Sequence, residues 1–425
     1  MRSRLHTGLN GLMLLLAVTV LVTVGAGGTT AFDEVYLAPS APGGGDPGAV
    51  FAKGPNMKSP RMRHLTVTLP DGRVALFGGH GTGFKSLNTA EIWTPATNRF
   101  TRVAMKFRHD AAGIARLNDG RYLLAGGLED LGVTPGYDTA EIFDPIANTF
   151  TATAGTMKYK RAYCAAATLN SGKVLVAGGT RAELHAPECE KYADLFNPDT
   201  GSFTATKALK VPRYYCLVLP CKDGKAVVLG GSRPEGGSVA EVELYNPSTN
   251  SFRILSNNLF GKEKGWYVAA ISSCPIEANR LADGKYLYWA VGLVDGVWEY
   301  RLFTFDPASK KIVRFDTTPA LPDGDTVVLD QPVVDKANNR AYLLGLLVGK
   351  DPTQFRVYSV DLATKTLVVP TGSHTLPKGQ HVDGAGLQLL QDGRIFVTGG
   401  HSKWGTEYDY SAINKTLFAT YREGY

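Results

Sequence analysis

Seven short turn sequences recur along the chain at a nearly constant spacing. Most read Asp-Gly followed by a basic residue, and neighbouring turns are 48 to 60 residues apart; their centres are Gly72, Gly120, Gly172, Gly224, Gly284, Asn339 and Gly393. Asp-Gly supplies the positive φ angles that a two-residue β-hairpin turn requires. A period near 50 residues indicates one supersecondary unit that is repeated and that buries its apolar face against its neighbours.

Each turn is followed by the same strand-like plan. An apolar run, such as VALF after the first turn, is typical of a strand buried on both faces. In five segments this run ends in a glycine pair: Gly78-Gly79, Gly126-Gly127, Gly178-Gly179, Gly230-Gly231 and Gly399-Gly400. A third strand that closes with proline follows, and then a fourth with a recurrent aromatic residue: Phe100, Phe150, Phe203 and Phe252. The pattern predicts an all-β chain of four-stranded units.

These motifs resemble the kelch repeat, and the resemblance covers roughly residues 50–420. It implies a seven-bladed kelch β-propeller with four-stranded antiparallel blades over residues 49–425. The fifth and sixth segments are degenerate, because Val291-Gly292 and Gly345-Leu346 replace the glycine pair. Residues 49–53 and 415–421 could each supply the strand that closes the ring, and we favour the N-terminal one.

Composition limits the class of protein. The chain is 44% apolar, which excludes a disordered protein, and its net charge of +6 is too small to indicate nucleic-acid binding. Residues 1–31 have a basic start, an apolar run and a small-residue cleavage site, so we expect a signal peptide; an uncleaved anchor is the alternative. Residues 32–48 are predicted to be a flexible lead-in. The mature protein is then secreted, periplasmic or on the cell surface, with no membrane span.

An exported chain can carry disulfides. Cys221 and Cys274 fall near the first turns of neighbouring segments, whereas Cys164, Cys189 and Cys216 fall at the opposite face of the expected ring. A disulfide joins Cα atoms no more than about 7 Å apart, so we expect Cys221–Cys274, and Cys189 bonded to Cys164 or Cys216. The alternative, that all five are buried thiols, stays open.

Arginines precede the first strand of the four consensus segments: Arg61, Arg108, Arg161 and Arg213. In kelch adaptors, arginines at this position line the peptide pocket, so the resemblance suggests ligand binding. The same segments carry an acid four residues before their proline: Glu91, Glu141, Asp194 and Glu243. Because the arginine and the acid occur together in the same four segments, we favour an ion pair inside each blade over a ligand role.

A second set of cations follows the turns: Arg73, Arg121, Lys173, Lys225, Lys285, Arg340 and Arg394. A basic ring for an acidic polysaccharide is one interpretation. Because exposed charges contribute little, we favour solvated hairpin flanks.

Tyr163 resembles the cross-linked tyrosine of copper-radical oxidases of the galactose oxidase type. The cysteine partner of that family would fall at Ala111, and its Tyr-His pair would fall at Arg63-His64. The family's second copper histidine comes from a domain without a counterpart here. The departures argue against copper-radical chemistry, and we expect neither a metal nor a cofactor.

The divergent segments carry the candidate ligand site. Trp266 and Tyr267 offer flat aromatic surface near Lys264, and sugars stack on such surfaces. At the same mouth we place Asp323, Asp325, His381, Asp383, His401 and His80. The sequence predicts an exported module that binds carbohydrate or protein. The alternatives are a sugar-active enzyme resembling the kelch sialic-acid mutarotases, with acid–base residues, and a purely structural surface module.

Overall fold

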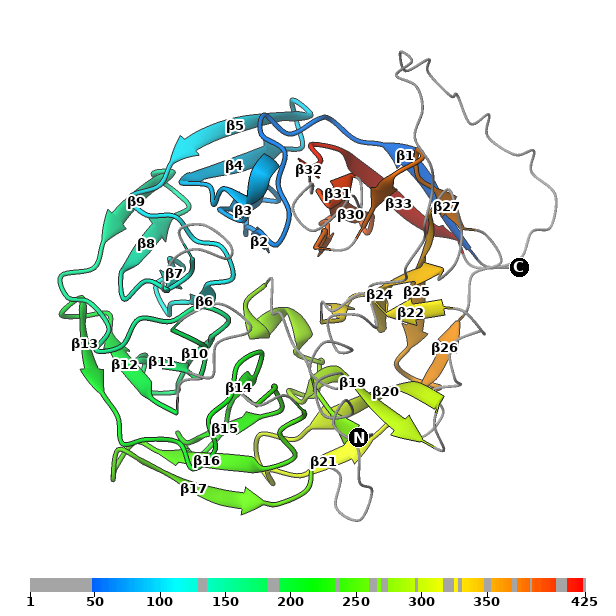
Figure 1. The fold of residues 1–425 in the computed structure, drawn as a ribbon. Helices are drawn as coiled ribbons and strands as arrows, with labels where there is room; N and C mark the ends of the chain where they lie inside the picture. Colours follow the sequence, from blue (N-terminus) through cyan, green and yellow to red (C-terminus); the bar gives the residue numbers. More distant parts are fainter. Residues whose placement is uncertain are drawn as a thin grey trace, which may run out of the picture.

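The protein forms seven antiparallel blades in a ring (Figure 1). The computed structural model describes residues 48–128, 136–181, 191–233, 237–259, 266–268, 274–294, 297–315, 325–327, 331–347, 353–368, 373–382, 384–402 and 411–422. Within these residues the fold is all-β apart from two short 3-10 helices, η1 (Thr82–Phe84) and η2 (Ile276–Asn279). The predicted seven-bladed propeller with four-stranded blades is confirmed.

The four consensus blades each contain four strands in chain order. Blades one and two consist of β2 (Leu65–Thr68), β3 (Val74–Phe77), β4 (Thr89–Thr94), β5 (Arg99–Ala104), β6 (Gly113–Arg116), β7 (Tyr122–Ala125), β8 (Ala140–Asp144) and β9 (Thr149–Ala152). Blades three and four consist of β10 (Ala165–Thr168), β11 (Val174–Ala177), β12 (Ala193–Asn197), β13 (Ser202–Ala205), β14 (Leu217–Pro220), β15 (Ala226–Leu229), β16 (Val242–Asn246) and β17 (Ser251–Ser256).

Blades five and six depart from this plan by having long central hairpins. Blade five consists of β18 (Trp266–Tyr267), β19 (Tyr286–Val294), β20 (Val297–Phe305) and β21 (Ile312–Arg314). Blade six consists of β22 (Asp325–Val327), β23 (Val333–Asp335), β24 (Arg340–Leu347), β25 (Gln354–Asp361), β26 (Thr366–Val368) and β27 (His374–Thr375).

Blade seven closes the ring with a strand from the beginning of the described chain. It consists of β29 (Gly386–Leu389), β30 (Ile395–Thr398), β33 (Thr416–Arg422) and β1 (Gly48–Lys53). A small sheet beside it contains β28 (Gln380–His381), β31 (His401–Ser402) and β32 (Ser411–Ala412). Strand β1 pairs antiparallel with β33 as the outermost strand, which confirms closure through the N-terminal strand.

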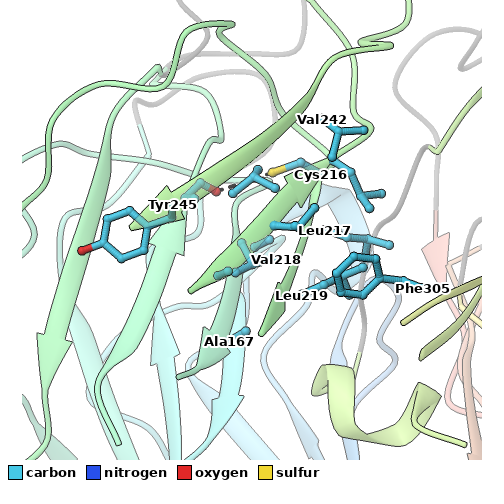
Figure 2. Close-up of a cluster of buried hydrophobic side chains, with 14 of the residues drawn as sticks. Ala167, Cys216, Leu217, Val218, Leu219, Val242, Tyr245 and Phe305 are labelled. Atoms are coloured by element: carbon cyan, nitrogen blue, oxygen red, sulfur yellow. Dashed lines mark hydrogen bonds between the residues drawn. The ribbon is translucent and has the colours of Figure 1, made fainter. Parts of the chain in front are cut away.

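The core lies between neighbouring blades. The second strands of blades one to four, such as VALF in β3, are buried along their whole length because a blade is covered on both faces. Figure 2 shows Leu217, Val218 and Leu219 of β14 among side chains from neighbouring strands, with Cys216 at the start of β14. Apolar burial between blades therefore stabilises the ring.

The glycine pairs connect one blade to the next. The amide of the second glycine donates to a carbonyl of the following blade, as in Gly127 N to Arg161 O at 2.8 Å and Gly400 N to Arg61 O at 3.3 Å. A Cβ on Gly78 would lie 2.2 Å from the carbonyl oxygen of His109, so only glycine fits there. We call the side with these pairs the loop face, and the side with the turns between first and second strands the hairpin face.

Helix η2 lies near the centre of the ring (Figure 1). Ile276 contacts a void of about 10 Å³ that is also lined by Ile114 of β6, Ala166 of β10 and Val218 of β14. These three residues belong to the first, innermost strands of blades two to four. The helix therefore packs against the axial strands next to the hairpin face.

Candidate functional site

The arginines before the first strands of blades one, three and four form ion pairs inside their own blades. The three bonds, Arg61–Glu91 at 2.9 Å, Arg161–Asp194 at 2.5 Å and Arg213–Glu243 at 2.9 Å, join side chains with no solvent exposure. The Nη1 atom of each arginine also donates to the carbonyl of the first glycine of the pair. The predicted intrablade ion pair is confirmed in these blades, and these guanidinium groups are occupied by contacts within their own blades.

Blade two uses a different residue at this position. His109, not Arg108, lies 17 residues before the first glycine of the pair, and its Nδ1 atom is 2.6 Å from the carbonyl oxygen of Gly126. Its Nε2 atom lies 3.0 Å from Glu141. The prediction that Arg108 pairs with Glu141 is wrong, because the residue aligned with the other arginines is the following one.

Three residues of each described consensus blade surround the axis on the loop face. The first follows the glycine pair: His80, Leu128, Thr180 and Ser232, with His401 in blade seven. The second bridges to the first across the blade: Met62, Asp110, Ala162 and Tyr214, with His381 in blade seven. The third has a left-handed backbone: Arg63, Ala111, Tyr163 and Tyr215, with φ between 52° and 57°. In blades one to four these positions share one backbone arrangement and differ in their side chains.

The acid–base groups at these positions gather in blades seven, one and two. His80 Nδ1 lies 2.9 Å from Asp110 Oδ2, and both side chains are buried. This contact joins blade one to blade two, unlike the ion pairs that stay within a blade. The Oδ1 atom of Asp110 is buried and has no hydrogen-bond partner in the described part of the chain. A carboxylate–imidazole pair of this kind can bind a polar ligand or move a proton.

His381 and His401 form a second pair next to the first. Their rings stack with centroids 4.9 Å apart, and Thr353 Oγ1 lies 3.1 Å from His381 Nδ1. Burial, the largest cause, together with the neighbouring His381, Arg63 and His80, lowers the pKa of His401 to about 3. His401 is therefore neutral at physiological pH. The predicted grouping of His80, His381 and His401 at one mouth agrees with this geometry.

Tyr163 and Tyr215 complete this group, which we call the axial polar cluster: Arg63, His80, Asp110, Tyr163, Tyr215, His381 and His401. The two tyrosine rings meet edge to face at 4.8 Å. Burial raises the pKa of the Tyr163 phenol, which lies in the field of Arg63 and Asp110, so the phenol stays protonated. Arg63 and His381 are partly exposed, as is Tyr214 beside Tyr215, while the other members are buried.

The cluster does not fit a copper-radical centre. Tyr163 N donates to the carbonyl of Ala111 at 2.6 Å, so Ala111 does occupy the neighbouring position where a cysteine would be needed. A methyl side chain forms no thioether. Within the described ranges, no group of three or more His, Cys, Asp or Glu side chains could hold a metal ion.

Trp266 is not an exposed stacking surface. Its side chain is 4% exposed and packs edge to face against Phe303, with the Arg301 guanidinium 5.0 Å from its ring centre. A Cβ on Gly292 would lie 2.6 Å from the indole, so the glycine of the degenerate segment makes room for this ring. The expectation that Trp266 stacks on a ligand is wrong, because β18 turns the indole into blade five.

For several predicted site residues, the structure describes only the backbone or does not describe the residue. Tyr267 and Asp325 are described only as backbone positions in β18 and β22. Asp383, Lys264, Asp323, Cys189 and residues 1–47 lie outside the described residues. Their assignments stay predictions.

The cations after the hairpin turns are mostly neutralised within their own turns. Five of them bond to the aspartate two residues earlier: Arg73, Arg121, Lys225, Lys285 and Arg394. These pairs are exposed at the hairpin face. The geometry agrees with hairpin flanks rather than with a basic ring.

The described cysteines are buried thiols, and none of these four forms a disulfide: Cys164, Cys216, Cys221 and Cys274. The predicted Cys221–Cys274 bond is therefore absent. Cys164 and Cys216 instead contact carbonyls of the preceding blade, at Ala125 and Ala177. Burial raises the pKa of Cys216 and of Cys221 to about 12, so these thiols are unreactive in the folded protein.

Sequence reasoning missed Asp110 and Tyr215, and it did not assign His109 to the position that arginine holds in the other blades. An alignment of the repeated segments reveals all three residues. In it, His109 and Asp110 take the places of Arg161 and Ala162. Aligning from the glycine pair backwards, rather than from the nearest arginine, would have found them.

The repeat, the four-stranded blades and the closed ring define a seven-bladed β-propeller of the kelch type. Among curated proteins, the chain is similar to Beta-scruin of Limulus polyphemus, with 26% identity over 198 residues that make up 45% of this chain and 21% of that protein. The chain thus spans about a fifth of the length of this relative. No family model matches the chain.

A similar solved structure is a fungal alcohol oxidase of the AA5 family in complex with copper. It has 15% identity and a TM-score of 0.57, and the match covers 87% of this chain and 76% of that one. At this identity the likeness shows the fold alone. The sequence relative and the structural neighbour both support the kelch propeller. In the described part of the chain, no helix has the length and apolar character needed to cross a membrane.

Proposed function

We propose that this protein is an exported kelch propeller that binds a carbohydrate at the axial polar cluster of its loop face. The observation that carries the proposal is the buried contact between His80 and Asp110, which crosses two blades and which the other described blades do not repeat. Buried titratable groups without a repeated structural role are typical of functional sites. Histidine, aspartate and tyrosine side chains offer the donors and acceptors that sugar hydroxyls need.

The blades that depart from the consensus at the cluster support the same site. Blades three and four have Thr180 and Ser232 where blades one and seven have His80 and His401. Packing alone accepts small residues at this position, which supports a further role for the two histidines. The partly exposed Arg63 and His381, with Tyr214 beside the cluster, are the side chains that a ligand would meet first.

The test is a glycan array probed with the full-length protein, followed by titration calorimetry on each hit. We expect Asp110→Asn and His381→Gln to abolish binding, while Thr180→Val, at the equivalent position of blade three, leaves it unchanged. Melting temperatures separate lost binding from lost folding. If no glycan binds and a protein partner is captured through the same residues instead, the carbohydrate assignment is wrong.

A second function, a sugar-active enzyme, is favoured by the same geometry. The contact between Asp110 and Nδ1 of His80 orients the imidazole, as general acid–base catalysis at a sugar requires. NMR measurement of mutarotation on any bound sugar tests it. Turnover of a bound sugar by the unmodified protein supports the enzyme, whereas binding without turnover supports the module.

Export is part of the proposal and is tested separately. N-terminal sequencing of the protein recovered outside the cytoplasm should begin near residue 32. A chain that begins at residue 1 in a membrane fraction would instead indicate an uncleaved anchor.

A further inference from the structure

A cavity opens on the hairpin face, on the opposite side of the ring from the axial polar cluster. Its volume is about 320 Å³, which is at the lower end of the range for small-molecule sites. It is bounded by the first turns of blades two to four, by η2 and by the start of blade five, including Asn118, Asn170, Lys222, Glu277, Arg280 and Tyr286. The cavity is therefore shared by four blades.

Three cations from separate elements line this cavity. Arg116 ends β6, Lys222 lies in the turn after β14, and Arg280 follows η2. None of the three forms an ion pair within 4 Å in the described ranges, whereas the cations after the turns bond to their own aspartates. The Arg280 guanidinium lies 5.9 Å from the centre of the Tyr286 ring, which holds it against the cavity wall. The cavity thus has three cations against one carboxylate, that of Glu277.

Glu277 is the acidic residue among the described lining residues. Its Oε2 atom is buried and makes no hydrogen bond within the described structure. Burial raises the pKa of Glu277, although Arg116, Arg280 and Lys336 act in the opposite direction. Glu277 also lines a second cavity of about 570 Å³ on the far side of η2, so the helix separates two depressions of the hairpin face.

We propose that the cavity of the hairpin face binds a small hydroxylated carboxylate, of the size of an acidic monosaccharide or smaller. The carboxylate would lie between Arg116 and Arg280, because guanidinium groups pair with carboxylates through two parallel hydrogen bonds. The hydroxyl groups would face the amide side chains of Asn118 and Asn170. A volume of about 320 Å³ holds one sugar unit and excludes a folded partner. This site is independent of the one proposed at the loop face.

Glucuronate, glucose and sulfate are the probes, each titrated into the full-length protein by calorimetry. We expect saturable binding of glucuronate, no binding of glucose and much weaker binding of sulfate. Arg116→Ala and Arg280→Ala should each weaken glucuronate binding by about tenfold, equivalent to about 1.4 kcal/mol. Glu277→Gln should strengthen it severalfold, since it removes a like charge beside the ligand.

The matched control is Arg121→Ala, which removes an exposed cation of the same blade that is bonded to its own turn aspartate. It should leave the affinity within about twofold. Equal binding of glucose and glucuronate, equal binding of sulfate, or unchanged affinity in both arginine variants would overturn the proposal, as would no saturable glucuronate binding. Because Asp110→Asn lies at the other face, it should not affect this titration.

Discussion

His109 lies 3.0 Å from Glu141 in blade two and takes the place that an arginine holds in blades one, three and four. The carboxylate is the constant member of this arrangement, and it also accepts backbone N–H groups, such as those of Lys106 and Phe107. The side chain that faces it, arginine or histidine, therefore serves the carboxylate, which ties the entry of each blade to its third strand.

Removing the cation from one of these pairs should destabilise the whole ring. Arg161→Ala leaves Asp194 buried without its counter-charge, so we expect the free energy of unfolding to fall by about 3–5 kcal/mol. Urea unfolding measures it. Arg121→Ala breaks an exposed pair and should cost at most about 1 kcal/mol. Equal losses in the two variants would contradict a structural role for the buried pair.

Trp266 and Gly292 should show strong coupling in blade five. Trp266→Ala leaves a cavity and should cost about 3–5 kcal/mol. Gly292→Ala should also destabilise, because its new methyl group meets the indole 2.6 Å away. In the double variant the methyl group enters the space left by the indole, so the two losses should not add. Additive losses in urea unfolding would show that the two residues do not share this space.

The burial of His401 should make stability fall in acid. Its pKa is about 3 in the folded protein, compared with 6.5 when unfolded, so the unfolded chain binds more protons between these values. As far as this group is concerned, the free energy of unfolding is highest above pH 6.5 and decreases as the pH falls toward 3. At pH 5 it amounts to a loss of about 2 kcal/mol relative to pH 7.5. Chemical unfolding across this range should show a shallower slope in His401→Gln, and parallel slopes would refute this assignment.

Deleting β1 should weaken the closed ring. Without residues 48–54, strand β33 presents an open edge, and Phe51 no longer packs on Phe355 of blade six, 5.2 Å away between ring centres. We expect a lower melting temperature in calorimetry and self-association in light scattering. Val50→Thr changes an exposed side chain of the same strand and is the control. A deletion variant that melts like the intact protein would contradict closure by β1.

Most of the fold was predictable because the consensus segments carry the same turn and glycine-pair signals. The turn glycines and the glycine pairs mark the two ends of the second strands, and the structure uses both with positive φ, as at Gly72 and Gly79. The strands of blade six could not be predicted in this way. Strands β22 and β23 both pair with β24, and no turn glycine or glycine pair marks where one strand ends.

The site was predicted less well, because side-chain direction depends on strand register. His80 and His401 follow glycine pairs, which fixes their backbone positions within the repeat. Trp266 has no such marker, and its two-residue strand gives no alternation from which to infer that it points inward. The cysteine pairing failed because sharing one face of the ring does not bring two Cα atoms within bonding distance.

The left-handed residues at the axis have a consequence for how such a protein can change. Arg63, Ala111, Tyr163 and Tyr215 adopt one backbone conformation although their side chains range from a methyl to a guanidinium. Each conformation costs a non-glycine residue about 1–2 kcal/mol, whichever side chain is present. The cost of the left-handed backbone at these positions is thus the same whichever side chain is present, while the chemistry of the side chains is free to vary. New recognition can arise there by exchanging single side chains, one blade at a time, on an unaltered scaffold.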